Sequence, residues 1–177
     1  MATTTPNNGW AVPTSTDFVK DGAVAIETLG DAIDASVGTG LLAWTTFVPT
    51  AAAGLTVGNG TFSTAYSKIG KVVQWRGWFR LGTTSAITGN PSLTLPFTAA
   101  ANSGIMTNGY GKNSCRDVSA NIRNPGACFI DPLNTSMSFT SYNSAGTFVT
   151  EPLLGSGSPF IWASQDEIAW FITYQSI

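Results

Sequence analysis

A single helical pattern, over residues 14–37, constrains the fold of this chain more than any other feature. Thr14 to Asp17 offer side-chain oxygens that can cap a helix N-terminus, and Gly38 and Gly40 supply a stop. We therefore predict a helix over residues 14–38. Its apolar residues recur at the a and d positions of a heptad repeat, and they are Val19, Ile26, Leu29 and Ile33.

This helix would be marginal by itself. Gly22 and Gly30 each cost about 1 kcal/mol relative to alanine, and isolated helices of this length are barely stable in water. The apolar seam is too narrow to cover a broad core, but it suits a short parallel bundle of identical chains. The alternative is an amphipathic helix that packs on its own domain. Between these two, the pattern favours self-association.

Residues 1–13, MATTTPNNGWAVP, form a tail that is too polar to fold alone. Chain ends of this kind are ordered only where something holds them. We therefore expect another chain or a larger assembly to hold this extended segment, with Trp10 as its best anchor.

The remaining part, residues 39–177, reads as strand after strand. Apolar and polar residues alternate in short runs, and turn residues recur at intervals of roughly 8–15 residues. This spacing predicts a mainly β fold, an antiparallel β-sandwich of the jelly-roll type. The predicted strands end in turns at 67–71 and 143–146, and they cover residues 62–66, 72–81, 91–96, 137–142 and 167–174.

The strand over residues 72–81 is the most informative of these. One face carries apolar residues suited to a core, whereas Arg76, Trp78 and Arg80 share the other face. A tryptophan between two arginines on a polar face needs a partner. It could lie in a subunit interface, lie under the arginines by cation–π contact, or stack on a sugar ring as a receptor contact.

The residues that most enzymes use are largely missing. There is no histidine, which removes Ser-His-Asp and Cys-His catalysis and most zinc sites. Gly38 to Ala43 match a dinucleotide-binding string but follow a helix, so they are better explained as a helix stop and linker. Paired carboxylates for glycoside hydrolysis are weak candidates among Asp117, Asp131, Glu151, Asp166 and Glu167. We expect no enzyme activity, no cofactor and no metal site.

The composition argues against two classes of partner, nucleic acids and membranes. Only 10% of the residues are charged, and the net charge is −2, so there is no basic footprint for nucleic acid. No apolar run is long enough to insert in a membrane, and no secretory signal is expected at the N-terminus. Cys115 and Cys128 could form one disulfide, but two buried thiols are favoured for a protein made in a cytoplasm.

Three stretches of this sequence resemble the minor tail and tail fibre (receptor-binding) proteins of actinobacterial and related bacteriophages. The first is NGWAVPTSTDFVKDGAVAIETLGDAID, residues 8–34. The second, residues 55–97, contains a GNGT turn and the Tyr66…Ile69-Gly70-Lys71 hairpin, and it ends with the pattern Gly82…Gly89…Leu95-Pro96. The last is PFIWASQDEIAWFITYQSI, residues 159–177. Residues 104–135 fit the resemblance least.

The resemblance implies a homotrimeric virion component that is assembled in the host cytoplasm. The tail, residues 1–13, would anchor it to other virion proteins through Trp10 and Pro13. The helix would trimerise the chain, and the β-domain would attach non-covalently to a host cell-surface glycan. A head fibre or capsid decoration protein, with a structural or weakly adhesive role, shares this plan and stays an alternative.

Overall fold

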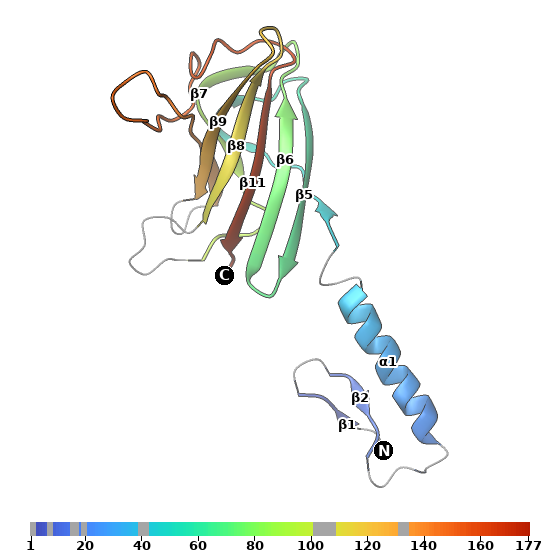
Figure 1. The fold of residues 1–177 in the computed structure, drawn as a ribbon. Helices are drawn as coiled ribbons and strands as arrows, with labels where there is room; N and C mark the ends of the chain where they lie inside the picture. The colour runs from blue at the N-terminus through green and yellow to red at the C-terminus, as the bar shows by residue number, and fades with distance from the viewer. Residues whose placement is uncertain are drawn as a thin grey trace. The chain divides into compact units, whose positions relative to one another are not determined.

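The computed structural model describes residues 3–6, 9–14, 18, 21–38, 43–100, 109–130 and 135–177. The chain forms two compact units, residues 1–43 and residues 44–177. The described part is mainly β with one helix, as predicted (Figure 1). The first unit contains both the predicted tail and the predicted helix.

The tail is not simply extended. Strands β1 (Thr3–Thr4) and β2 (Ala11–Val12) pair antiparallel. The Thr5 N–H donates to the Trp10 carbonyl at 2.8 Å, and the Trp10 N–H donates to the Thr5 hydroxyl at 3.0 Å. These hydrogen bonds close a small hairpin, so the described part of this segment is not fully extended.

Helix α1 (Gly22–Gly38) begins later than predicted and ends at the predicted stop. Phe18 is not helical, and its carbonyl accepts a hydrogen bond from the Asp21 N–H at 2.9 Å. The chain thus turns immediately before α1, and Thr14, the first residue of the predicted cap, lies well outside the helix. Val19 and Gly40 lie outside the described residues.

Helix α1 packs on β2 along one side and leaves part of its apolar stripe open. Val24 and Ala25 border a hollow against Ala11 and Val12. Of the predicted seam residues that the structure describes, Leu29 is half-buried, whereas Ile26 (66%) and Ile33 (38%) are exposed. The helix therefore combines an intramolecular contact with an uncovered apolar seam.

The described residues of the second unit form one antiparallel sheet of nine strands, which curls (Figure 1). Along the sheet the order is β3-β5-β6-β11-β8-β9-β10-β7-β4. The strands are β3 (Thr45–Thr46), β4 (Ala51–Thr56), β5 (Thr61–Ile69), β6 (Val72–Arg80), β7 (Ala86–Thr94), β8 (Gly109–Asp117), β9 (Ile122–Ile130), β10 (Ser136–Phe139) and β11 (Glu167–Gln175).

One segment, residues 45–56, joins the two edges of this sheet. Strand β3 pairs with β5 at one edge, and β4 pairs with β7 at the other. Between them, the Phe47 N–H donates to the Thr64 carbonyl at 3.3 Å, and the Thr94 N–H donates to the Thr50 carbonyl at 3.0 Å. Because β3 and β4 are the two edge strands and are consecutive in the chain, this segment bridges the two edges of the curled sheet.

The core lies on the inner face of the curled sheet. The predicted inward alternation of β6 and β11 is confirmed, since Val73, Trp75 and Phe79 are buried together with the alternate residues of β11. Trp170 of β11 stacks edge-on against Trp75, with ring centroids 5.2 Å apart. The buried residues of β11 are Ile168, Trp170, Ile172 and Tyr174.

Three strand predictions were wrong. Residues 109–130, for which no strand was predicted, form β8 and β9 between β11 and β10. Strand β5 continues to Ile69, so the turn contains only Gly70 and Lys71 instead of residues 67–71. Strand β7 starts at Ala86 and includes Pro91, which was expected at a strand end.

Candidate functional site

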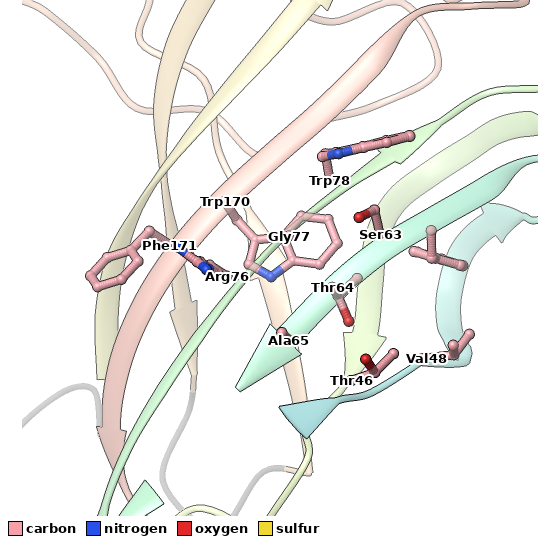
Figure 2. Close-up of a pocket in the computed structure, with 11 residues that line it drawn as sticks. Thr46, Val48, Ser63, Thr64, Ala65, Arg76, Gly77, Trp78, Trp170 and Phe171 are labelled. Carbon is pink, nitrogen blue, oxygen red and sulfur yellow. The ribbon is translucent and has the colours of Figure 1, made fainter. Parts of the chain in front are cut away.

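An open groove of about 650 Å³ lies on the outer face of the sheet (Figure 2). The register places Thr46 beside Ala65, Ala65 beside Arg76, and Arg76 beside Phe171, so these side chains share one face across β3, β5, β6 and β11. Trp78 lines the groove too. The volume falls within the range of about 300–1,000 Å³ that is typical of ligand pockets.

Trp78 is half-buried, and one arginine covers it. The Arg80 guanidinium lies 5.1 Å from the centroid of the indole ring. The same guanidinium donates to the Glu167 carboxylate from Nε at 2.9 Å and from Nη2 at 2.6 Å. Arg80 is therefore fixed by a carboxylate and by a cation–π contact, and both restrict the orientation of the indole.

Arg76 has a different partner. Its guanidinium lies 4.0 Å from the ring centroid of Trp44, just before β3. Of the two arginines that were expected to contact Trp78, only Arg80 does so, and Arg76 contacts Trp44 instead. Sequence reasoning missed Trp44, because 32 positions separate it from Arg76 and only the pairing of β3 with β5 brings the two together.

A close approach of strands holds the floor of the groove. A Cβ atom on Gly77 would lie 2.6 Å from the Thr64 Cβ, so only glycine lets the Thr64 side chain lie against β6. The Thr64 hydroxyl then donates to the Phe47 carbonyl. This hydrogen bond fastens the segment that carries Thr46 and Val48, which form the far side of the groove.

The buried Asp166 has a structural role. It accepts hydrogen bonds from the Val118 N–H at 2.9 Å and the Ala163 N–H at 2.7 Å, which ties two turns together. The exposed Asp117 accepts from the Ala120 N–H at 2.9 Å, and this bond lowers the pKa of its carboxyl group. Neither carboxylate lines the groove.

Glu151 and Glu167 are held apart by different partners. Glu151 accepts hydrogen bonds from the Tyr110 hydroxyl at 2.8 Å and the Thr140 hydroxyl at 2.7 Å, and the bond to Glu151 raises the pKa of Tyr110. Glu167 pairs with Arg80 on β6 and with Arg116 on β8 at 3.6 Å. Asp131 lies outside the described residues. The four described carboxylates of the β unit thus bond to turns and to neighbouring strands.

The two cysteines are separate, buried thiols. Cys115 faces Asn124 and Cys128 faces Gly111, so the cysteines are offset by four positions on neighbouring strands. This offset is about 13 Å, far beyond the reach of a disulfide. Burial raises the pKa of each thiol to about 12, which keeps both protonated at neutral pH.

The proposed anchor and seam residues lie in the other unit. Trp10 is half-buried and Pro13 is exposed, and both lie at the hairpin formed by β1 and β2. Within the described ranges no three His, Cys, Asp or Glu residues could together hold a metal ion. A search of the same residues finds no helix with the length and apolar character needed to cross a membrane.

Comparisons with known proteins assign no family to this chain. No protein-family model, no curated protein and no solved structure matches the chain.

Proposed function

We propose that this chain is a homotrimeric bacteriophage tail fibre or receptor-binding protein that attaches non-covalently to a host cell-surface glycan. The outer-face groove, which is lined by the half-buried Trp78 and by Phe171, carries this proposal, and Arg80 lies over the indole ring of Trp78. An indole presents a large apolar surface on which a sugar ring can stack. The hydroxyl groups of Thr46 and Ser63 line the same groove, where they can bond to sugar hydroxyls.

The exposed seam of α1 supports the trimer. Ile26 and Ile33 lie one heptad apart, and burying each against two other copies would remove apolar surface from water. In this proposal α1 is the stem of a short trimeric coiled coil, and the curled sheet is a jelly-roll-like display domain. The hairpin that contains Trp10 and Pro13 contacts other virion proteins. Three weak groove contacts in one trimer would act together through their high effective concentration.

The experiment is Trp78→Ala in the full chain, with Phe148→Ala as control. Phe148 is an aromatic residue that is 81% exposed and does not line the groove. We expect Trp78→Ala to keep the oligomeric state and to lose at least about tenfold in adsorption to host cells, the usual effect of truncating a central aromatic contact. Phe148→Ala should adsorb normally. Unchanged adsorption for Trp78→Ala, or dissociation of its trimer, would contradict the receptor site.

A head fibre or capsid decoration protein is the second candidate. Arg80 already covers part of the Trp78 ring and is itself paired with Glu167, so this cluster is satisfied without a ligand. An electron cryomicroscopy map of the particle tests the choice. Density for residues 1–13 on the tail supports the receptor-binding protein, whereas density on the capsid shell supports the decoration protein.

A further inference from the structure

The cations of the β unit gather on one face of the sheet. The register puts Arg80, Glu167, Arg116 and Arg123 in one row across β6, β11, β8 and β9. A second row, four residues along the strands, contains Arg76, Phe171 and Lys112. Each cationic row thus crosses several strands, and the rows run side by side about 13 Å apart.

The residues between the rows are mostly small. Trp78, Ala169, Ser114 and Pro125 occupy the intervening row of the same face. Across four strands, at about 4.8 Å per step, this row is about 14 Å long. The two cationic rows therefore border a strip that begins at the Trp78 groove and continues toward β9.

Few carboxylates compensate these charges. Five cations, Arg76, Arg80, Lys112, Arg116 and Arg123, share the face with Glu167, which pairs with two of them. The other described carboxylates of the unit have partners of their own: Glu151 bonds to Thr140 and to Tyr110, which lies two residues from Lys112 on the same face of β8, Asp117 caps its turn, and Asp166 is buried. Seven of the chain's eight basic residues belong to residues 44–177, against five of its ten acidic residues.

We infer that this strip, residues Trp78, Ala169, Ser114 and Pro125 with the two cationic rows beside it, binds an anionic glycan, one that repeats carboxylate or phosphate groups along its chain. The inference rests on the proposed function and names the chemical class of its receptor. A sugar ring stacks on Trp78, and the anionic groups of the following units contact Arg116, Arg123 and Lys112. Arg80 is held in place by Glu167, so it meets the ligand with little loss of side-chain freedom.

The test measures binding of the purified full chain to four polymers of matched length. Polygalacturonate carries carboxylates, poly(glycerol phosphate) carries phosphates, dextran is neutral, and single-stranded DNA is an anion that is not a glycan. The test variant is Lys112→Gln/Arg123→Gln, which removes two cations far from Trp78. The control is Lys68→Gln/Lys71→Gln, which removes two cations near the β5–β6 turn, outside both rows.

We expect one of the two anionic polymers to bind at least about tenfold more tightly than dextran, with an affinity that falls as salt rises, because exposed charges are screened. Lys112→Gln/Arg123→Gln should weaken this binding by about fivefold, since exposed ion pairs are individually weak. Lys68→Gln/Lys71→Gln should leave it unchanged. If polygalacturonate binds more tightly, the anionic group of the receptor is a carboxylate, and if poly(glycerol phosphate) does, it is a phosphate.

The contrary outcomes separate this inference from the proposed function. Equal, salt-independent binding to dextran would overturn the anionic class while leaving a glycan receptor site in place. Tightest binding to DNA would overturn it in favour of a nucleic-acid surface. An equal loss in both double variants would show nonspecific charge attraction and would overturn it as well. Loss of host adsorption in Trp78→Ala is measured independently of all three.

Discussion

Single glycines decide how closely the strands of the curled sheet approach one another. A Cβ atom on Gly126 would lie 2.0 Å from the Thr140 carbonyl oxygen, and one on Gly111 would lie 2.3 Å from the Phe171 carbonyl oxygen. At Gly77 the obstacle is the β-branched side chain of Thr64, which cannot swing away easily. At these positions the absence of a side chain is a packing requirement.

Gly77→Ala should therefore destabilise the β unit. The added methyl group has to displace Thr64, and overpacking of this kind costs about 1–3 kcal/mol. Urea unfolding followed by tryptophan fluorescence measures the change. Gly157→Ala is the control, because a Cβ there meets nothing within 4 Å, and its free energy of unfolding should stay within about 0.5 kcal/mol of the native value. Equal stability of both variants would refute the close approach.

The buried thiols make stability depend on alkaline pH. Burial raises the pKa of Cys115 and Cys128 from 9.0 to about 12, so above pH 9 the unfolded chain loses protons that the folded chain retains. Unfolding is then favoured, and the contribution of the thiols to the free energy of unfolding should be constant well below pH 9 and fall as the pH rises toward 12. Burial raises the pKa of Tyr174 to about 12 and adds to the fall above pH 10.

Urea titrations at pH 7.5, 9 and 10.5 measure this dependence. Cys115→Ala/Cys128→Ala should show a smaller fall in the free energy of unfolding between pH 9 and 10.5 than the native chain, although its stability at pH 7.5 is lower because two core side chains are truncated. The same fall in both proteins would place its origin outside the thiols.

At the scale of elements, the sequence predicts those strands whose inner residues are large and apolar. Strands β6 and β11 show strict alternation, and their inner residues are buried as expected. Strand β8 escaped prediction because its inner face carries Gly111, Asn113 and Cys115, which give no apolar period. Hydrophobic periodicity fails where a sheet uses small and polar residues for close packing. The Arg76–Trp44 contact could not be predicted either, since it depends on which strands pair.

The segment that closes the sheet should depend on one hydroxyl group. Thr64→Val keeps the shape of the side chain but removes the bond to the Phe47 carbonyl, at a cost of about 1 kcal/mol. Hydrogen exchange should become faster at the Phe47 N–H, which bonds to the Thr64 carbonyl. Thr61→Val, at an exposed position of the same strand, should leave this exchange rate unchanged. Unchanged exchange in Thr64→Val would show that other contacts hold the segment.

Considered as a whole, the chain separates its charges between its two units. Residues 1–43 contain one lysine and five acidic residues, whereas residues 44–177 contain seven basic and five acidic residues. The net charge of −2 conceals this division, which is why composition alone gave no sign of a cationic sheet face. The trimer seam of α1 stays a prediction from the heptad pattern, whereas the hairpin of β1 and β2 arises from backbone hydrogen bonds that no side-chain pattern reveals.

The oligomeric state is the property on which the whole proposal depends, and one substitution tests it. Ile26→Asp places a charge on the exposed seam of α1, where a bundle would bury it without a partner. Ala23→Asp adds the same charge one turn earlier, on the exposed side that Ala23 shares with Glu27 and Asp34.

Light scattering should find trimers for the native chain and for Ala23→Asp, and monomers for Ile26→Asp. Circular dichroism should show the β unit intact in all three, because the substitutions lie outside residues 44–177. A native chain that is monomeric with α1 formed would refute the trimer.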